Sequence, residues 1–113
     1  MEQKQIFKKL LKEKQKEIFE TAKEKGFYDC GERNEGEMIA LIHSELSEAL
    51  EALRHGNPKS DHIPKFSLVE EELADAIIRI LDLAEYKGYD ISGAMLEKMK
   101  FNKTRERKHG KMF

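Results

Sequence analysis

Two stretches decide the fold: ALIHSELSEALEALR at residues 40–54 and EELADAIIRILDLA at residues 71–84. In both, apolar residues recur at intervals of three and four, which places them on one face of an α-helix. A half-buried strand would instead alternate apolar and polar residues, and neither stretch does so. We therefore expect two amphipathic helices with broad apolar faces.

Acidic residues interrupt the apolar faces of these two predicted helices. On a helical wheel Glu45 falls inside the first apolar arc, and Glu48 falls at its edge. Glu72 borders the second arc, and Asp75 follows it three residues later. A carboxylate on the buried side of a helix costs several kcal/mol unless it is paired or binds a cation.

The spacing of these acids predicts a metal site. Residues three apart project side by side, so Glu45 with Glu48 and Glu72 with Asp75 are two pairs of neighbouring carboxylates. If the two helices pack face to face, the four carboxylates converge and need cations to share a partly buried pocket. Oxygen ligands completed by water select Mg²⁺ or Mn²⁺. The alternative is that these acids form surface salt bridges with lysine and arginine.

The rest of the chain extends the helical pattern to both sides. Ser67 and Glu70 have the spacing of a capping box, and Gly56 followed by Pro58 is a strong stop signal. We expect an all-α, four-helix bundle in a single domain over residues 1–113, with helices at about 3–25, 35–55, 67–87 and 91–108.

Composition narrows the function classes. Lys and Arg (21) nearly balance Asp and Glu (22), so net charge gives no case for nucleic-acid binding. No apolar run approaches the 18 or so residues that span a bilayer, so we expect no membrane partner. The single cysteine, Cys30, excludes an intramolecular disulfide. We expect a cytoplasmic protein.

A basic stripe on the last predicted helix suits a polyphosphate. Lys98, Asn102 and Arg105 recur at i, i+4 and i+7, His109 joins them if the helix continues, and Lys111 follows. Lysine and arginine are phosphate ligands, and asparagine binds phosphate or sugar oxygens. The alternative is an ordinary solvated face, which the other lysines nearby favour. Beside an acidic metal site, the stripe would complete a grip on a metal-bound polyphosphate.

The ordered motifs resemble a known family. Glu45-Leu-Ser-Glu48 followed by Glu72-Leu-Ala-Asp75 is similar to the ExxE…ExxD signature of the MazG-like, all-α nucleoside triphosphate pyrophosphohydrolase superfamily. The segments 40–54, 71–84 and 102–111 strengthen the likeness, which covers about residues 20–113. The resemblance implies a MazG-like bundle that assembles as a homodimer or tetramer.

The resemblance also implies a reaction and residue roles. Glu45, Glu48, Glu72 and Asp75 would hold Mg²⁺, and Lys98, Asn102 and Arg105 would hold phosphates. Related enzymes cleave between the α- and β-phosphates, releasing a monophosphate and pyrophosphate. A metal-activated water would attack the α-phosphorus, with Glu48 as the expected proton acceptor beside Glu45.

One departure and several alternatives accompany this hypothesis. Tyr28 stands where relatives often carry tryptophan, which leaves the base preference open. The leading hypothesis is a pyrophosphohydrolase that sanitises the nucleotide pool; a dUTP- or dCTP-specific pyrophosphatase is the second. A non-catalytic helical interaction protein is an alternative from another class. A di-iron bundle normally needs Glu-x-x-His pairs, and neither Glu45 nor Glu72 has a histidine three residues later.

Overall fold

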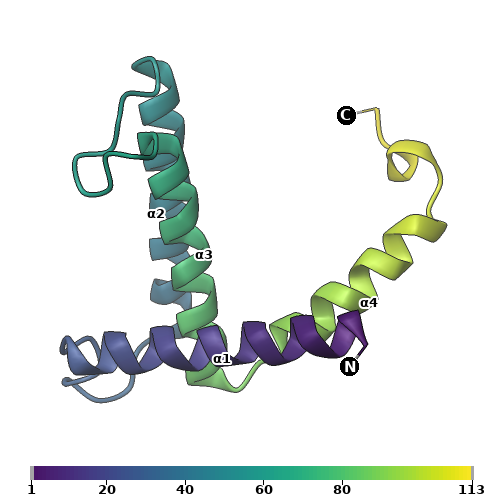
Figure 1. The fold of residues 1–113 in the computed structure, drawn as a ribbon, viewed down its shortest axis with the longest axis horizontal. Coiled ribbons are helices and arrows are strands. Elements are labelled where there is room, and N and C mark those ends of the chain that lie inside the picture. The colour runs from purple at the N-terminus through teal and green to yellow at the C-terminus, as the bar shows by residue number, and fades with distance from the viewer. Residues whose placement is uncertain (1, 113) are drawn as a thin grey trace.

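A computed structural model describes residues 2–112. Over this range the chain is all-α, with no strand and one isolated bridge between Lys59 and Ser67. The all-α, four-helix prediction is confirmed (Figure 1). The elements in chain order are α1 (Gln3–Glu24), α2 (Glu35–Arg54), α3 (Leu68–Lys87), α4 (Ile91–Thr104) and a short 3₁₀ helix, η1 (Arg107–Gly110).

Local hydrogen bonds set the helix ends. The Ser67 hydroxyl accepts from the Glu70 backbone N–H while the Glu70 carboxylate accepts from the Ser67 N–H, so the predicted capping box is present. Asn34 caps α2 by accepting from the Glu37 N–H. Gly88 ends α3 with a left-handed φ of 75°, a conformation that costs glycine little.

The last helix is shorter than predicted. It ends at Thr104 rather than near residue 108, because Arg105 adopts an extended backbone with φ −82° and ψ 154°. The Thr104 hydroxyl donates to the Phe101 carbonyl at 2.6 Å within the last turn of the helix. The helical stripe therefore includes Lys98 and Asn102, whereas Arg105 lies at the C-cap and Lys111 lies beyond η1.

Helices α2 and α3 form an antiparallel pair and lie side by side in Figure 1. Alanines at the buried positions Ala49, Ala52, Ala76 and Ala84 let the two helices approach closely. The apolar arcs are wider than this contact, so part of each arc stays exposed in the single chain. The large apolar residues left exposed on α2 and α3 are Ile39, Leu46, Leu50, Leu53, Leu73, Ile77, Ile78 and Ile80.

Helix α1 crosses α3, and α4 packs against α1 while diverging from the α2–α3 pair (Figure 1). The buried Gln15 of α1 donates to the Glu85 carboxylate at 3.2 Å and to the Tyr89 carbonyl at 3.3 Å. No helix within residues 2–112 has the length and apolar character to cross a membrane.

A polar network fastens the segment after α1 to α3. The Tyr28 hydroxyl donates to Asp82 at 2.8 Å, and the Tyr28 ring lies 4.9 Å from that of Phe19 and 5.0 Å from that of Tyr86. The Tyr86 hydroxyl in turn accepts from the Arg33 backbone N–H at 2.9 Å. Asp82 is only 7% exposed, so this contact is a buried anchor rather than a surface pair.

Replacing Tyr28 by phenylalanine should lower the free energy of unfolding by about 1–3 kcal/mol, the usual cost of removing the partner of a buried polar group. Urea unfolding followed by circular dichroism measures the change. Tyr89→Phe is the matched control, because the Tyr89 hydroxyl donates to Glu35 at the surface. If Tyr28→Phe is as stable as that control, the buried anchor has no energetic role.

Candidate metal centre

Three of the four predicted metal ligands meet between α2 and α3. Glu45, Glu72 and Asp75 each place one carboxylate oxygen within 4.8 Å of the others, and we call these residues the acidic triad. Glu45 is 8% exposed, as its place inside the apolar arc predicts, and the other two are half-buried. Glu48 is exposed to solvent, and its carboxyl contributes to the raised pKa of Glu72.

The protein supplies hydrogen-bond partners to only some of the carboxylate oxygens of the acidic triad. Arg79 donates from Nε to Glu45 Oε1 at 2.9 Å. Glu72 Oε2 is buried and has no hydrogen-bond partner in the part of the chain described. A buried carboxylate oxygen without a partner is unusual in native proteins and calls for a proton, a water or an ion. The donor set, which is all carboxylate oxygen, is the kind that Mg²⁺ and Mn²⁺ accept.

Crowding alters the acidity of the triad. Burial, followed by the neighbouring carboxyls of Glu48 and Glu45, raises the pKa of Glu72 to about 8. Burial also raises the pKa of Asp75, and the Glu45 charge adds to this effect. For Glu45, burial acts upward, but the hydrogen bonds from Arg79 and from its acidic neighbours outweigh it and lower the pKa. Without a metal, the crowding therefore favours a proton on Glu72 rather than on Glu45.

A cleft of about 440 Å³ opens beside the triad, between α1 and α3. Its volume lies within the range of small-molecule sites. The triad members Glu45 and Asp75 line one part of it, and α1 contributes a mixed apolar and polar wall. The lining residues are Glu17, Ile18, Thr21, Ala22, Lys25, Phe27, Arg33, Glu45, Asp75, Ile78, Arg79 and Asp82.

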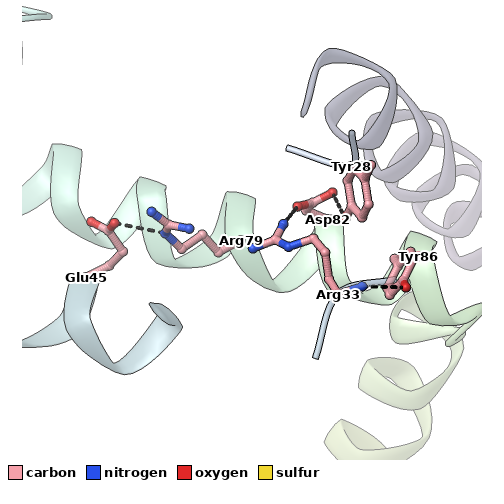
Figure 2. A network of polar contacts seen from close by, with 6 residues as sticks. All are labelled: Tyr28, Arg33, Glu45, Arg79, Asp82 and Tyr86. Atoms are coloured by element: carbon pink, nitrogen blue, oxygen red, sulfur yellow. Dashed lines mark hydrogen bonds and ion pairs between the residues drawn. The ribbon is translucent and has the colours of Figure 1, made fainter. Parts of the chain in front are cut away.

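Asp82, which accepts the Tyr28 hydrogen bond, lines this cleft. Figure 2 shows Asp82 next to Tyr28 and Arg33. Arg33 forms an ion pair with Asp82 at 3.5 Å and lies over the Tyr28 ring, 5.3 Å from its centroid. The Tyr28 ring is thus already stacked within the protein. Phe27, in contrast, lines the cleft and is 59% exposed, so it is the aromatic side chain that a ligand in the cleft can reach.

The predicted phosphate ligands lie apart from the triad within this chain, since α4 packs on α1. The Lys98 ammonium lies over the Phe101 ring at 4.6 Å, and the Arg105 guanidinium lies over the same ring at 5.5 Å. Asn102 Oδ1 is buried without a partner among residues 2–112. Lys111 is exposed, and the side chain of His109 is outside the described residues. The residues that line the cleft come from the chain before α4.

Three residues of this region were not predicted as site residues: Arg33, Arg79 and Asp82. Arg79 carried a sequence signal, because it stands four residues after Asp75 in a stripe of acids and is the only cation in that stripe. Its ion pair with Glu45 depends on the register of α3 against α2, which a helical wheel of one helix does not show. Arg33 carried no signal, because a loop residue is placed by tertiary contacts alone.

Comparisons with protein-family models, with curated proteins and with solved structures found no match for this chain.

The raised pKa of Glu72 predicts that the metal-free protein loses stability as the pH rises. A group whose folded pKa exceeds its unfolded value contributes stability that is complete below the unfolded pKa and lost as the pH passes the folded pKa. For Glu72 these limits are 4.5 and about 8. The melting temperature of the metal-free protein should therefore fall across this window, and fall less in Glu72→Gln.

Saturating Mg²⁺ should reverse this loss, most strongly at the alkaline end, because metal ligands must be deprotonated. Differential scanning fluorimetry with and without Mg²⁺ measures both effects. Parallel pH profiles for wild type and Glu72→Gln would contradict the assignment of the proton to Glu72.

Proposed function

We propose that this chain is a Mg²⁺-dependent nucleoside triphosphate pyrophosphohydrolase of the MazG-like type, which converts a nucleoside triphosphate and water to the monophosphate and pyrophosphate. The observation that carries the proposal is the acidic triad. Glu45, Glu72 and Asp75 each place one carboxylate oxygen within 4.8 Å of the others, and a buried Glu72 oxygen has no partner among residues 2–112. The order of the motifs along the chain supports the same reaction class.

A purely structural role for the acids agrees less well with their contacts. Structural carboxylates are normally paired with cations or capped by N–H groups. Here Arg79 donates a hydrogen bond to Glu45, whereas Glu72 has a buried oxygen without a hydrogen-bond partner among residues 2–112 and a pKa raised to about 8. The carboxyls of Glu45 and Asp75, whose pKa values are shifted down and up, line the cleft, and such groups are typical of functional sites. This contrast favours the enzyme over the non-catalytic interaction protein.

The triad would hold the cation, with Glu48 at the solvent side as a further ligand or as the proton acceptor. When bound, Mg²⁺ supplies charge neutralisation for the phosphates and acidifies water. Glu48 is exposed beside the triad, so its carboxylate can take a proton and release it to solvent. Glu45, shielded from water and held from one side by Arg79, is a positioned ligand rather than a mobile base.

The cleft would receive the nucleoside. Phe27 offers an exposed ring for base stacking. Tyr28 stands at the position where relatives often carry tryptophan, but its hydroxyl already donates to Asp82. The cleft volume of about 440 Å³ accommodates a purine or a pyrimidine. A dUTP- or dCTP-specific pyrophosphatase therefore stays the second candidate within the same chemistry.

Phosphate ligands from α4 would come from a second copy of the chain. In one chain Lys98, Asn102 and Arg105 do not line the cleft, and α4 diverges from α2 and α3 (Figure 1). The exposed apolar residues of α2 and α3 form a surface that self-association would bury. We propose a homodimer, or a tetramer built from dimers, in which α4 of one protomer supplies these residues to the other.

Glu45→Gln should abolish pyrophosphate release while the fold is kept. Glutamine preserves size and can still accept from Arg79, but it removes the charge that holds a divalent cation. Turnover is followed on a panel of canonical and modified nucleotides with Mg²⁺, with pyrophosphate and orthophosphate assayed separately. Glu51→Gln, an exposed position on the same helix, is the control. Unchanged turnover in Glu45→Gln, or orthophosphate as the only product, contradicts the proposal.

Lys98→Ala should raise KM about tenfold or more and change kcat less, because a lysine that binds the terminal phosphates contributes ground-state affinity. Initial rates over a range of nucleotide concentrations separate the two constants. Lys103→Ala removes the same charge from the last turn of α4 and should leave KM near the wild-type value. Equal KM values for both variants would remove Lys98 from the site.

A further inference from the structure

We propose that Arg79 is an exchangeable counter-ion: it neutralises Glu45 in the metal-free protein and moves to the substrate phosphates when a divalent cation takes Glu45. This inference rests on the proposed function. It assigns to Arg79 a role in selecting a cation–triphosphate complex over the bare cation.

The position of Arg79 makes both states accessible. Its Nε donates to Glu45 Oε1 at 2.9 Å, and its own side chain is 35% exposed against 10% for that of Glu45. Arg79 also lines the cleft beside the triad. Figure 2 shows the side chain extending from α3 towards Glu45 on α2, with Asp82 and Arg33 lying on the other side of it. The hydrogen bond to Glu45 uses Nε of Arg79, so the two terminal guanidinium nitrogens take no part in it.

Arg79 and a cation in the triad compete for one carboxylate. Glu45 is both the acceptor of the Arg79 bond and a member of the group that could hold an ion. A guanidinium and a divalent ion at the same carboxylate repel each other, and the repulsion is strong in a partly buried site. Binding a bare cation therefore includes the cost of displacing Arg79 from Glu45.

Displaced Arg79 has other anionic partners within reach of its side chain. Asp82, which is not a member of the triad, stands three residues after it on α3, and the Arg79 charge acts on the pKa of Asp82 in the lowering direction. A triphosphate in the cleft adds oxygens that a guanidinium binds in a bidentate manner. The cost of leaving Glu45 is then offset by the phosphate contact, so cation and triphosphate bind better together than separately.

This exchange predicts effects of opposite sign for one substitution. Arg79→Ala should bind Mg²⁺ alone about tenfold more tightly, because the competing cation is gone. The same variant should bind the Mg²⁺ complex of a triphosphate analogue about tenfold more weakly, because one phosphate ligand is lost. A residue with only a structural role would weaken both.

Isothermal titration calorimetry measures both affinities on the intact chain. The probes are MgCl₂ alone and the Mg²⁺ complex of a nucleoside triphosphate with a methylene bridge between the α- and β-phosphorus atoms. Arg54→Ala removes the same charge from the exposed end of α2 and is the matched control. Arg79→Lys, which keeps the charge, should stay within about threefold of the wild type for Mg²⁺ alone. Circular dichroism confirms that each variant is folded.

The outcomes separate the inference from the function on which it rests. Tighter Mg²⁺ binding with weaker analogue binding in Arg79→Ala supports the exchange. If wild type binds Mg²⁺ and Arg79→Ala binds it equally or less tightly, the exchange is overturned and the proposed function stands. If wild type binds no Mg²⁺, both are overturned.

Discussion

The close approach of three carboxylates, one from α2 and two from α3, is the interaction on which the rest of this molecule depends. Small residues such as Ala49 and Ala76 bring the two helices together, and Glu45, Glu72 and Asp75 then have to share one partly buried space. Two features reduce their repulsion: the raised pKa of Glu72 and the ion pair between Arg79 and Glu45. Both are reversible, as the proposed exchange of a proton and a guanidinium for a divalent ion requires.

The remaining elements place a cleft next to this group. Helix α1 supplies one wall, and the segment after it is held to α3 by the buried Tyr28–Asp82 hydrogen bond. Arg33 reinforces that anchor and also lines the cleft. The position of the cleft beside the triad thus follows from contacts about two turns along α3 from the acids.

The sequence predicted the helices and the burial of Glu45 because both depend on local periodicity. The wheel places Glu45 inside an apolar arc, and the residue is indeed 8% exposed. The wheel could not predict which part of each arc faces the neighbouring helix, since Leu46 and Ile77 lie on apolar arcs and are exposed. It also missed the pairing of Arg79 with Glu45, which depends on the register of α2 against α3. The end of α4 was misplaced because the extended backbone at Arg105 has no local breaker residue.

The most direct test of the acidic triad as a metal site is a crystal structure with Mn²⁺, located by its anomalous scattering. We expect a strong peak within bonding distance of carboxylate oxygens from Glu45, Glu72 and Asp75, with Arg79 no longer bonded to Glu45. Mn²⁺ peaks at other surface carboxylates but none at the triad, with Arg79 still bonded to Glu45, would contradict the assignment of the triad as a metal site.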